Sequence, residues 1–277
     1  MKTLIIASYN GEQKGFTVRN HNLEQVDYVD LEFEVNGIAV GTNSDVFLAT
    51  ANKLNHYQQD GTLIKCMEFP DTTIKYTNVI VAEDKIIASY SGSQKGFTVR
   101  NRSLEETHCV ETDFEIKGLT TGANGDLFLI STTTLYHYKM DGTLVNQSEN
   151  VVGGIEYTDV TIVGSKIVIA YAQHGISGGF TVMNKDFPQP NQGGFSQPMP
   201  GQGGFSQPMP GQGGFSQPIV MPTNVAISGI VAGANDDVFF VGGNQIAHYS
   251  LAGGKLSVKA FDQADVSYNS VSALVAN

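Results

Sequence analysis

Short apolar segments that alternate with polar residues recur along the chain, each bounded by Gly, Asn, Asp or Ser. Val, Ile, Thr, Phe and Tyr dominate these segments, which is typical of β-strands. No window places apolar residues at the i, i+3, i+4, i+7 spacing of an amphipathic helix. The pattern therefore predicts an all-β protein. One stretch of the chain contains four such segments in series: Asn78–Ala82, Lys85–Tyr90, Gly96–Arg100 and Leu104–Val110.

The segments recur because the sequence repeats itself at a spacing of 81 residues. From Ile5 to Glu83, 37 of 79 positions are identical to the residue 81 positions further on. The octapeptide Gln13–Asn20, for example, returns unchanged as Gln94–Asn101. A third, more divergent copy contains Gly179–Asn184. The three repeats comprise residues 1–81, 82–162 and 163–277.

Each 81-residue unit is itself double, since Ile86–Tyr90 lies 41 residues before the similar segment Leu127–Ser131. Four strands in about 40 residues, repeated in series, are the signature of a β-propeller blade. Without the 30 residues of an inserted, threefold decapeptide (191–220), the remaining 247 of the 277 residues suffice for six blades. The sequence therefore predicts a six-bladed β-propeller that spans residues 1–277 as a single domain.

The two ends of the chain are predicted to pair with each other. The chain starts at the second strand of a blade, because Leu4–Tyr9 matches Lys85–Tyr90, and the matching first strand lies at the other end, where Tyr268–Val271 matches Tyr76–Val79. Residues 268–277 should close the ring and so remove free sheet edges. The copy in mid-chain also indicates that the N-terminal segment belongs to the fold and is not a cleaved leader.

The even blades carry a pattern of their own. In blade four, Gly122–Leu129 combines a glycine turn, an acidic residue and a short apolar strand, and a second strand then leads to Asp141-Gly142. This pattern resembles the repeat of NHL-type propellers and covers about half of the chain. The resemblance implies the fold and no function. The Gly-Phe-Thr-Val-Arg-Asn motif of the odd blades identifies no family, and the absence of Trp excludes WD repeats in the strict sense.

The amino-acid composition argues against some classes of binding partner. Lys and Arg number 16 against 27 Asp and Glu, and the net charge of −11 argues against nucleic-acid binding. No apolar run approaches the ~18 residues of a membrane span. The default compartment is the cytoplasm, with leaderless export left open. Cys66 and Cys109 lack metal-ligand spacing and are expected to be reduced, half-buried thiols.

An insertion at residues 187–222 interrupts blade five between its third and fourth strands. A decapeptide that begins at Asn191 occurs three times and is rich in Gly, Pro and Gln, so we expect an extended segment without sheet or helix. Two interpretations stay open. The insertion is either a neutral expanded loop or an element for self-association or partner docking, mediated by one aromatic residue per decapeptide: Phe195, Phe205 and Phe215.

The channel side of the inner strands offers little chemistry. Resemblance to lactonase-type six-bladed propellers would place carboxylate and amide oxygens around calcium, but only Asn78 and Asp159 could contribute and a third ligand of this kind is missing. We predict no cofactor and no catalytic residues. The positions that should face the channel are Asn78, Asp159 and Ser270 in odd blades and Asn36, Lys117 and Ser228 in even blades.

Repeated histidines and loops complete the candidates. His56, His137 and His248 are equivalent by the repeat and too far apart to share a metal, so we expect packing or hydrogen bonds between blades. Phe16, Phe97 and Phe180 are expected in the blade core. Loops of the odd blades could present aromatic platforms and polar donors to a sugar, although turn chemistry alone also explains them. Their candidate ligand-binding residues are Tyr9, Gln13, Lys14, Tyr90, Gln94, Lys95, Tyr171 and His174.

These observations favour a non-catalytic propeller that acts as an interaction or assembly module. A multivalent lectin-like protein is the alternative, and a calcium-dependent lactonase-like hydrolase comes third. Near-threefold repetition favours the first two, because a catalytic site needs several different groups at one point. The expected partner is a protein or a second copy of the chain, and for the lectin-like alternative a carbohydrate.

Overall fold

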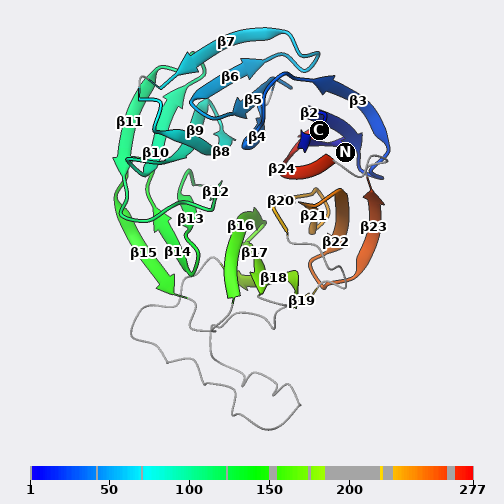
Figure 1. Ribbon diagram of the computed structural model, residues 1–277. Coiled ribbons are helices and arrows are strands. Elements are labelled where there is room, and N and C mark those ends of the chain that lie inside the picture. Colours follow the sequence, from blue (N-terminus) through cyan, green and yellow to red (C-terminus); the bar gives the residue numbers. More distant parts are fainter. Residues whose placement is uncertain are drawn as a thin grey trace.

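The computed structural model describes residues 2–41, 43–69, 71–122, 124–149, 155–173, 176–184, 219–220, 227–260 and 266–276. Within these ranges, 24 strands form six four-stranded antiparallel sheets and no helix occurs. The sheets are arranged as blades around a central axis (Figure 1). The protein is a six-bladed β-propeller, as the repeats predicted.

In each blade the first strand lies next to the axis and the fourth lies at the outer rim (Figure 1). Blade one consists of β24 (Val266–Ala276), β1 (Lys2–Gly11), β2 (Gly15–Asn20) and β3 (Gln25–Asp30). Blade two consists of β4 (Gly37–Val40), β5 (Val46–Ala49), β6 (Lys53–Tyr57) and β7 (Leu63–Glu68). Blade three consists of β8 (Lys75–Ala82), β9 (Lys85–Ser91), β10 (Gly96–Asn101) and β11 (Glu106–Glu111).

The second half of the ring repeats this order. Blade four consists of β12 (Gly118–Thr121), β13 (Leu127–Ile130), β14 (Thr134–Tyr138) and β15 (Leu144–Glu149). Blade five consists of β16 (Ile155–Val163), β17 (Lys166–Gln173), β18 (Ile176–Asn184) and β19 (Ile219–Val220). Blade six consists of β20 (Gly229–Ala232), β21 (Asp237–Gly242), β22 (Gln245–Ser250) and β23 (Lys255–Ala260).

The C-terminal strand closes the ring. β24 pairs antiparallel with β1, from Lys2 opposite Ala276 to Gly11 opposite Val266, and it forms the inner strand of blade one. The two ends of the chain therefore lie side by side (Figure 1). The closure predicted from the match between the terminal segments is confirmed, and the N-terminal segment is part of a sheet.

The core lies between the blades. Successive side chains of a strand point to opposite faces of its sheet, so each blade contributes one apolar face to each neighbour. In the interface between blades one and two, Phe16 and Val18 pack with Ile38 and Val46. Phe16, Phe97 and Phe180 are fully buried, which confirms their prediction as core residues.

The insertion of blade five ends in the sheet. β19 pairs with Gly179 and Phe180 of β18 and so supplies the fourth strand of this blade. The rest of the segment expected at residues 187–222 lies outside the described residues. In the part of the chain that the structure does describe, no helix is long and apolar enough to cross a membrane.

Candidate functional site

The six inner strands surround a channel with a cavity volume of about 150 Å³. Aliphatic side chains such as Val40, Val81 and Ile230 form much of its wall, and a few polar side chains lie among them. Whether this channel offers a binding site depends on what those polar groups already contact.

The polar side chains of the odd blades tie each blade to the next even blade. Asn78 Nδ2 donates a hydrogen bond to the carbonyl of Lys117 at 3.1 Å. Asp159 Oδ2 accepts one from the Ile230 N–H at 2.8 Å. Ser270 Oγ accepts one from the Ile38 N–H at 3.2 Å. These three equivalent positions therefore serve the assembly of the ring.

The even blades use their channel-side positions in a related way. Asn36 Nδ2 donates to the carbonyl of Tyr76 at 2.8 Å, and Ser228 Oγ donates to the carbonyl of Tyr268 at 2.8 Å. Lys117 forms an ion pair with Glu115 at 3.0 Å. The predicted channel residues are thus engaged with the protein itself.

Asp159 is a poor calcium ligand in this setting. Burial raises the pKa of its carboxyl from 3.8 to about 7, although hydrogen bonds from the backbone N–H groups of Ile230 and Val160 act in the opposite direction. A large fraction of the carboxyl is therefore protonated near neutral pH, and both of its oxygens already accept backbone hydrogen bonds. A calcium centre finds no support in this geometry.

The equivalent histidines each belong to an Asp–His pair within one even blade. The Nε2 atoms of His56, His137 and His248 lie 2.8, 3.3 and 2.7 Å from an aspartate Oδ2. A phenylalanine ring stacks on each imidazole, with centroids 4.2 to 4.7 Å apart. The aspartates, which the sequence analysis missed, are Asp45, Asp126 and Asp237, each 11 residues before its histidine.

A side chain from the following odd blade completes two of these pairs. Arg102, in the turn between β10 and β11, donates to Asp45 Oδ2 at 3.0 Å. His21, in the turn between β2 and β3, places its Nε2 3.7 Å from Asp237 Oδ2. Contacts between blades therefore exist at these positions, as expected. The aspartates Asp45 and Asp237, which the sequence did not reveal, form the polar contacts with the next blade.

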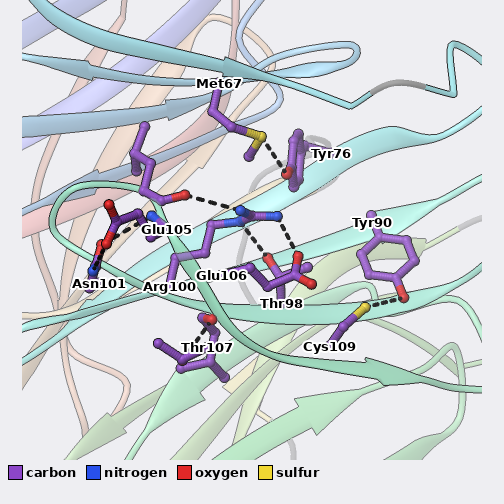
Figure 2. Close-up of polar contacts among 12 residues, drawn as sticks. Met67, Tyr76, Tyr90, Thr98, Arg100, Asn101, Glu105, Glu106, Thr107 and Cys109 are labelled. Carbon is purple, nitrogen blue, oxygen red and sulfur yellow. Dashed lines mark hydrogen bonds and ion pairs between the residues drawn. The ribbon is translucent and has the colours of Figure 1, made fainter.

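Buried arginines explain the repeated Gly-Phe-Thr-Val-Arg-Asn motif. Arg100 donates to the Leu104 carbonyl at 3.0 Å, to Glu106 Oε2 at 2.6 Å and to Thr98 Oγ1 at 3.2 Å (Figure 2). Its equivalent Arg19 donates to Tyr268 Oη on the closing strand at 3.0 Å. These guanidinium groups hold the turn that ends each motif and have a structural role.

The tyrosines proposed for sugar binding do not form an exposed platform, and this expectation was wrong. Tyr9, Tyr90 and Tyr171 are 1 to 2% exposed. Tyr9 Oη donates to Asp30 at 2.9 Å, and burial followed by this hydrogen bond raises the pKa of the phenol above its usual range. Tyr90 Oη lies 3.5 Å from Cys109 Sγ (Figure 2).

The polar members of the same loops lie closer to solvent. Gln13, Gln94 and Lys95 are exposed, and Lys14 is partly buried. Gln94 donates to Glu111 at 3.3 Å, and Lys14 lies 3.9 Å from Glu34. Sugar binding by these loops stays a prediction that a glycan array would test.

The remaining candidates fall outside the described residues or differ in exposure. His174, Phe195, Phe205 and Phe215 are not among the described residues. Cys66 and Cys109 form no disulfide, and both are exposed rather than half-buried.

Comparisons with known proteins agree with the architecture and go no further. A crystal structure of a protein of unknown function from Bacteroides caccae aligns with a TM-score of 0.71 at 10% identity, over 99% of this chain and 98% of that one. The WD40 β-propeller domain of Doa1 aligns with a TM-score of 0.62 at 8% identity, over 95% of this chain and 86% of that one. At these identities the likeness concerns the fold alone.

No protein-family model and no curated protein sequence matches the chain. The similarity of the even blades to NHL repeats is therefore one of sequence pattern alone. The fold and its contacts define a six-bladed β-propeller in which Asn78, Asp159 and Ser270 of the inner strands join neighbouring blades.

Proposed function

We propose that the protein is a non-catalytic interaction module that associates with further copies of its own chain. This proposal is supported by a difference between the inner and the outer strands in the groups that are available to a partner. The channel-side groups of Asn78, Asp159 and Ser270 are engaged between blades, whereas large apolar side chains are exposed on the outer strands.

The exposed apolar residues follow the repeat. Ile64, Val145 and Leu256 occupy equivalent positions on β7, β15 and β23, and their exposed fractions are 50, 49 and 56%. Leu63 and Leu144 precede two of them and are exposed to a similar extent. Fourth strands also present unpaired backbone groups at the sheet edge, which favours pairing with another chain. The rim of the even blades thus offers three similar apolar surfaces.

The decapeptide insertion is the segment we assign to these surfaces. It carries no charge from Phe187 to Thr223, while the whole chain has a net charge of −11 that opposes direct contact between two propeller bodies. Burial of one Phe contributes about 1.5–3 kcal/mol, so three together contribute about 4.5–9 kcal/mol toward association, and the loss of entropy on binding offsets part of this. In this proposal the phenylalanines of one copy dock on the rim of the next.

The triple substitution Phe195→Ser, Phe205→Ser and Phe215→Ser is expected to convert assemblies to monomers. It removes the apolar side chains and keeps the length and charge of the insertion. Sedimentation velocity over a range of concentrations measures the change, and the melting temperature should stay the same. The control replaces Gln192, Gln202 and Gln212 by Ser at the same ten-residue spacing and should associate like the parent.

The rim offers an independent test of the same contact. Changing Ile64, Val145 and Leu256 to Lys places charges on the three exposed positions without entering the core, so the fold should persist and association should fall. If both triple variants sediment like the parent, the proposed contact does not exist.

Deleting residues 188–218 should leave the propeller intact. This deletion retains β19, which pairs with β18 in blade five, and loop-closure entropy depends only weakly on loop length. We expect circular dichroism and the melting temperature to change little while self-association is lost. A collapse of the fold would indicate that the segment packs into the propeller.

A further inference from the structure

His21, Asp237 and His248 meet where blade six adjoins blade one. Asp237 begins β21, His248 lies on β22, and His21 reaches across from the turn between β2 and β3. Asp237 Oδ2 lies 2.7 Å from His248 Nε2 and 3.7 Å from His21 Nε2, and ligand atoms of all three residues fall within 4.8 Å of one another. The cluster thus joins the two blades at which the ring closes.

The same place between blades two and three contains a different third residue. There Asp45 contacts His56 at 2.8 Å and Arg102 at 3.0 Å. His21 and Arg102 are equivalent by the 81-residue repeat, and the third repeat has Lys185 at the matching sequence position. At this sequence position the second and third repeats carry a cationic side chain, and only the first repeat carries an imidazole.

The presence of His21 in place of an arginine changes the chemistry of the cluster. A guanidinium is always charged and can only donate hydrogen bonds, so Arg102 satisfies the carboxylate of Asp45 and cannot bind a metal. A neutral imidazole offers a nitrogen lone pair. The cluster at blades six and one consequently contains two imidazole nitrogens and one carboxylate oxygen, a ligand set that zinc uses in proteins.

We propose that His21 Nε2, His248 Nε2 and Asp237 Oδ2 bind a zinc ion. With zinc–ligand bonds of about 2.0–2.1 Å, tetrahedral ligand atoms lie about 3.3 Å apart. The two Asp–His separations of 2.7 and 3.7 Å bracket this value, and all three ligand atoms lie within 4.8 Å of one another, so movement of the side chains alone can form the site. The side chain of His21 is 36% exposed, which gives the ion a path from solvent and room for a water as fourth ligand.

The buried part of the cluster is held in place before any ion arrives. Asp237 and His248 have side-chain exposures of 4 and 6%. The backbone N–H of Asn235 donates to Asp237 Oδ1 at 3.3 Å and leaves Oδ2 facing the histidines. The ring of Phe239 stacks on His248 with centroids 4.2 Å apart. Such support limits the entropy that metal binding must overcome.

Zinc in this position links the last complete blade of the chain to the first. Because an ion that binds only the folded protein stabilises it, zinc should raise the melting temperature in proportion to the logarithm of its concentration.

Calorimetric titration of zinc into untagged, chelator-treated protein tests the proposal. We expect about one zinc per chain for the parent protein. His21→Arg reproduces the residue of the second repeat, should keep the ion pair and the fold, and should abolish binding. The reciprocal variant Arg102→His should gain a second site with Asp45 and His56, and the stoichiometry should rise to about two.

Cobalt provides a second measurement that reports geometry. Bound in the same site, Co²⁺ should give the visible absorption of a four-coordinate ion, and His21→Arg should eliminate it. The proposal is overturned if the parent protein takes up no zinc, or if His21→Arg binds zinc as tightly as the parent. The latter result would assign the metal to other histidines of the chain.

Discussion

Removal of residues 268–277 is expected to open the propeller ring and to abolish its stable fold. β24 supplies the inner strand of blade one and pairs with β1 along its length. The deletion also removes Tyr268, which is 1% exposed and accepts a hydrogen bond from the buried Arg19. The loss would expose the apolar edge of β1, which favours aggregation.

Thermal unfolding and light scattering of the truncated protein measure this effect. A circular permutant that begins at Val266 and joins Asn277 to Met1 is the matched control, because it retains every strand, makes blade one continuous and leaves two residues for the connecting turn. The permutant should melt near the parent temperature, while the truncated chain should aggregate. A truncated protein as soluble and heat-stable as the parent would contradict the closure of the ring by β24.

Gly118→Ala is expected to destabilise the junction of blades four and five by about 3 kcal/mol, the upper range for overpacking a core. A Cβ at Gly118 would lie 2.8 Å from Asp159 Cα and 3.0 Å from Val160 N, and these are backbone atoms that cannot move aside. The hydrogen bond between Asp159 and Ile230 depends on the position of the same strand.

Chemical denaturation measures this loss as a lower midpoint. Gly125→Ala is the control, since no atom lies within 4 Å of its Cβ position. Its positive φ of 75° costs an alanine about 1 kcal/mol, so the two variants separate crowding from backbone strain. Equal destabilisation by both would show that the inner strands can move apart.

The blades and their closure could be predicted because they follow from period-two patterns and repeats, which are properties of the sequence itself. Tyr9 ends the repeated apolar segment Ile5–Tyr9, and its assignment to a ligand-binding loop overlooked this position. Ile5, Ala7 and Tyr9 point to the same face of β1, and all three are buried. Tyr9 lies opposite Gly15, whose missing side chain leaves room for the phenol.

The pairing of each aspartate with its histidine could have been predicted from the sequence, but the contacts of these pairs with the next blade could not. The constant spacing of 11 residues between each aspartate and its histidine was a usable signal, because both residues belong to one blade. The approach of His21 to Asp237 was not, since the two are distant in sequence and meet only when the ring closes. Contacts between blade six and blade one can be identified only once the three-dimensional fold is known.

The contacts of the channel residues could not be predicted from the sequence either. The positions of Asn78, Asp159 and Ser270 on the inner strands followed from the repeat, but their hydrogen bonds to the next blade did not. From the sequence alone, these polar side chains could equally have been available to bind a ligand. Their use between blades became evident only from the register of neighbouring sheets.

Light scattering of the parent protein across a hundredfold range of concentration tests the proposed association most directly. The account predicts a mass per particle that rises with concentration above that of one 29.7 kDa chain and returns to it when Phe195, Phe205 and Phe215 are changed to Ser. A mass of one chain at every concentration would contradict self-association as the function of this propeller.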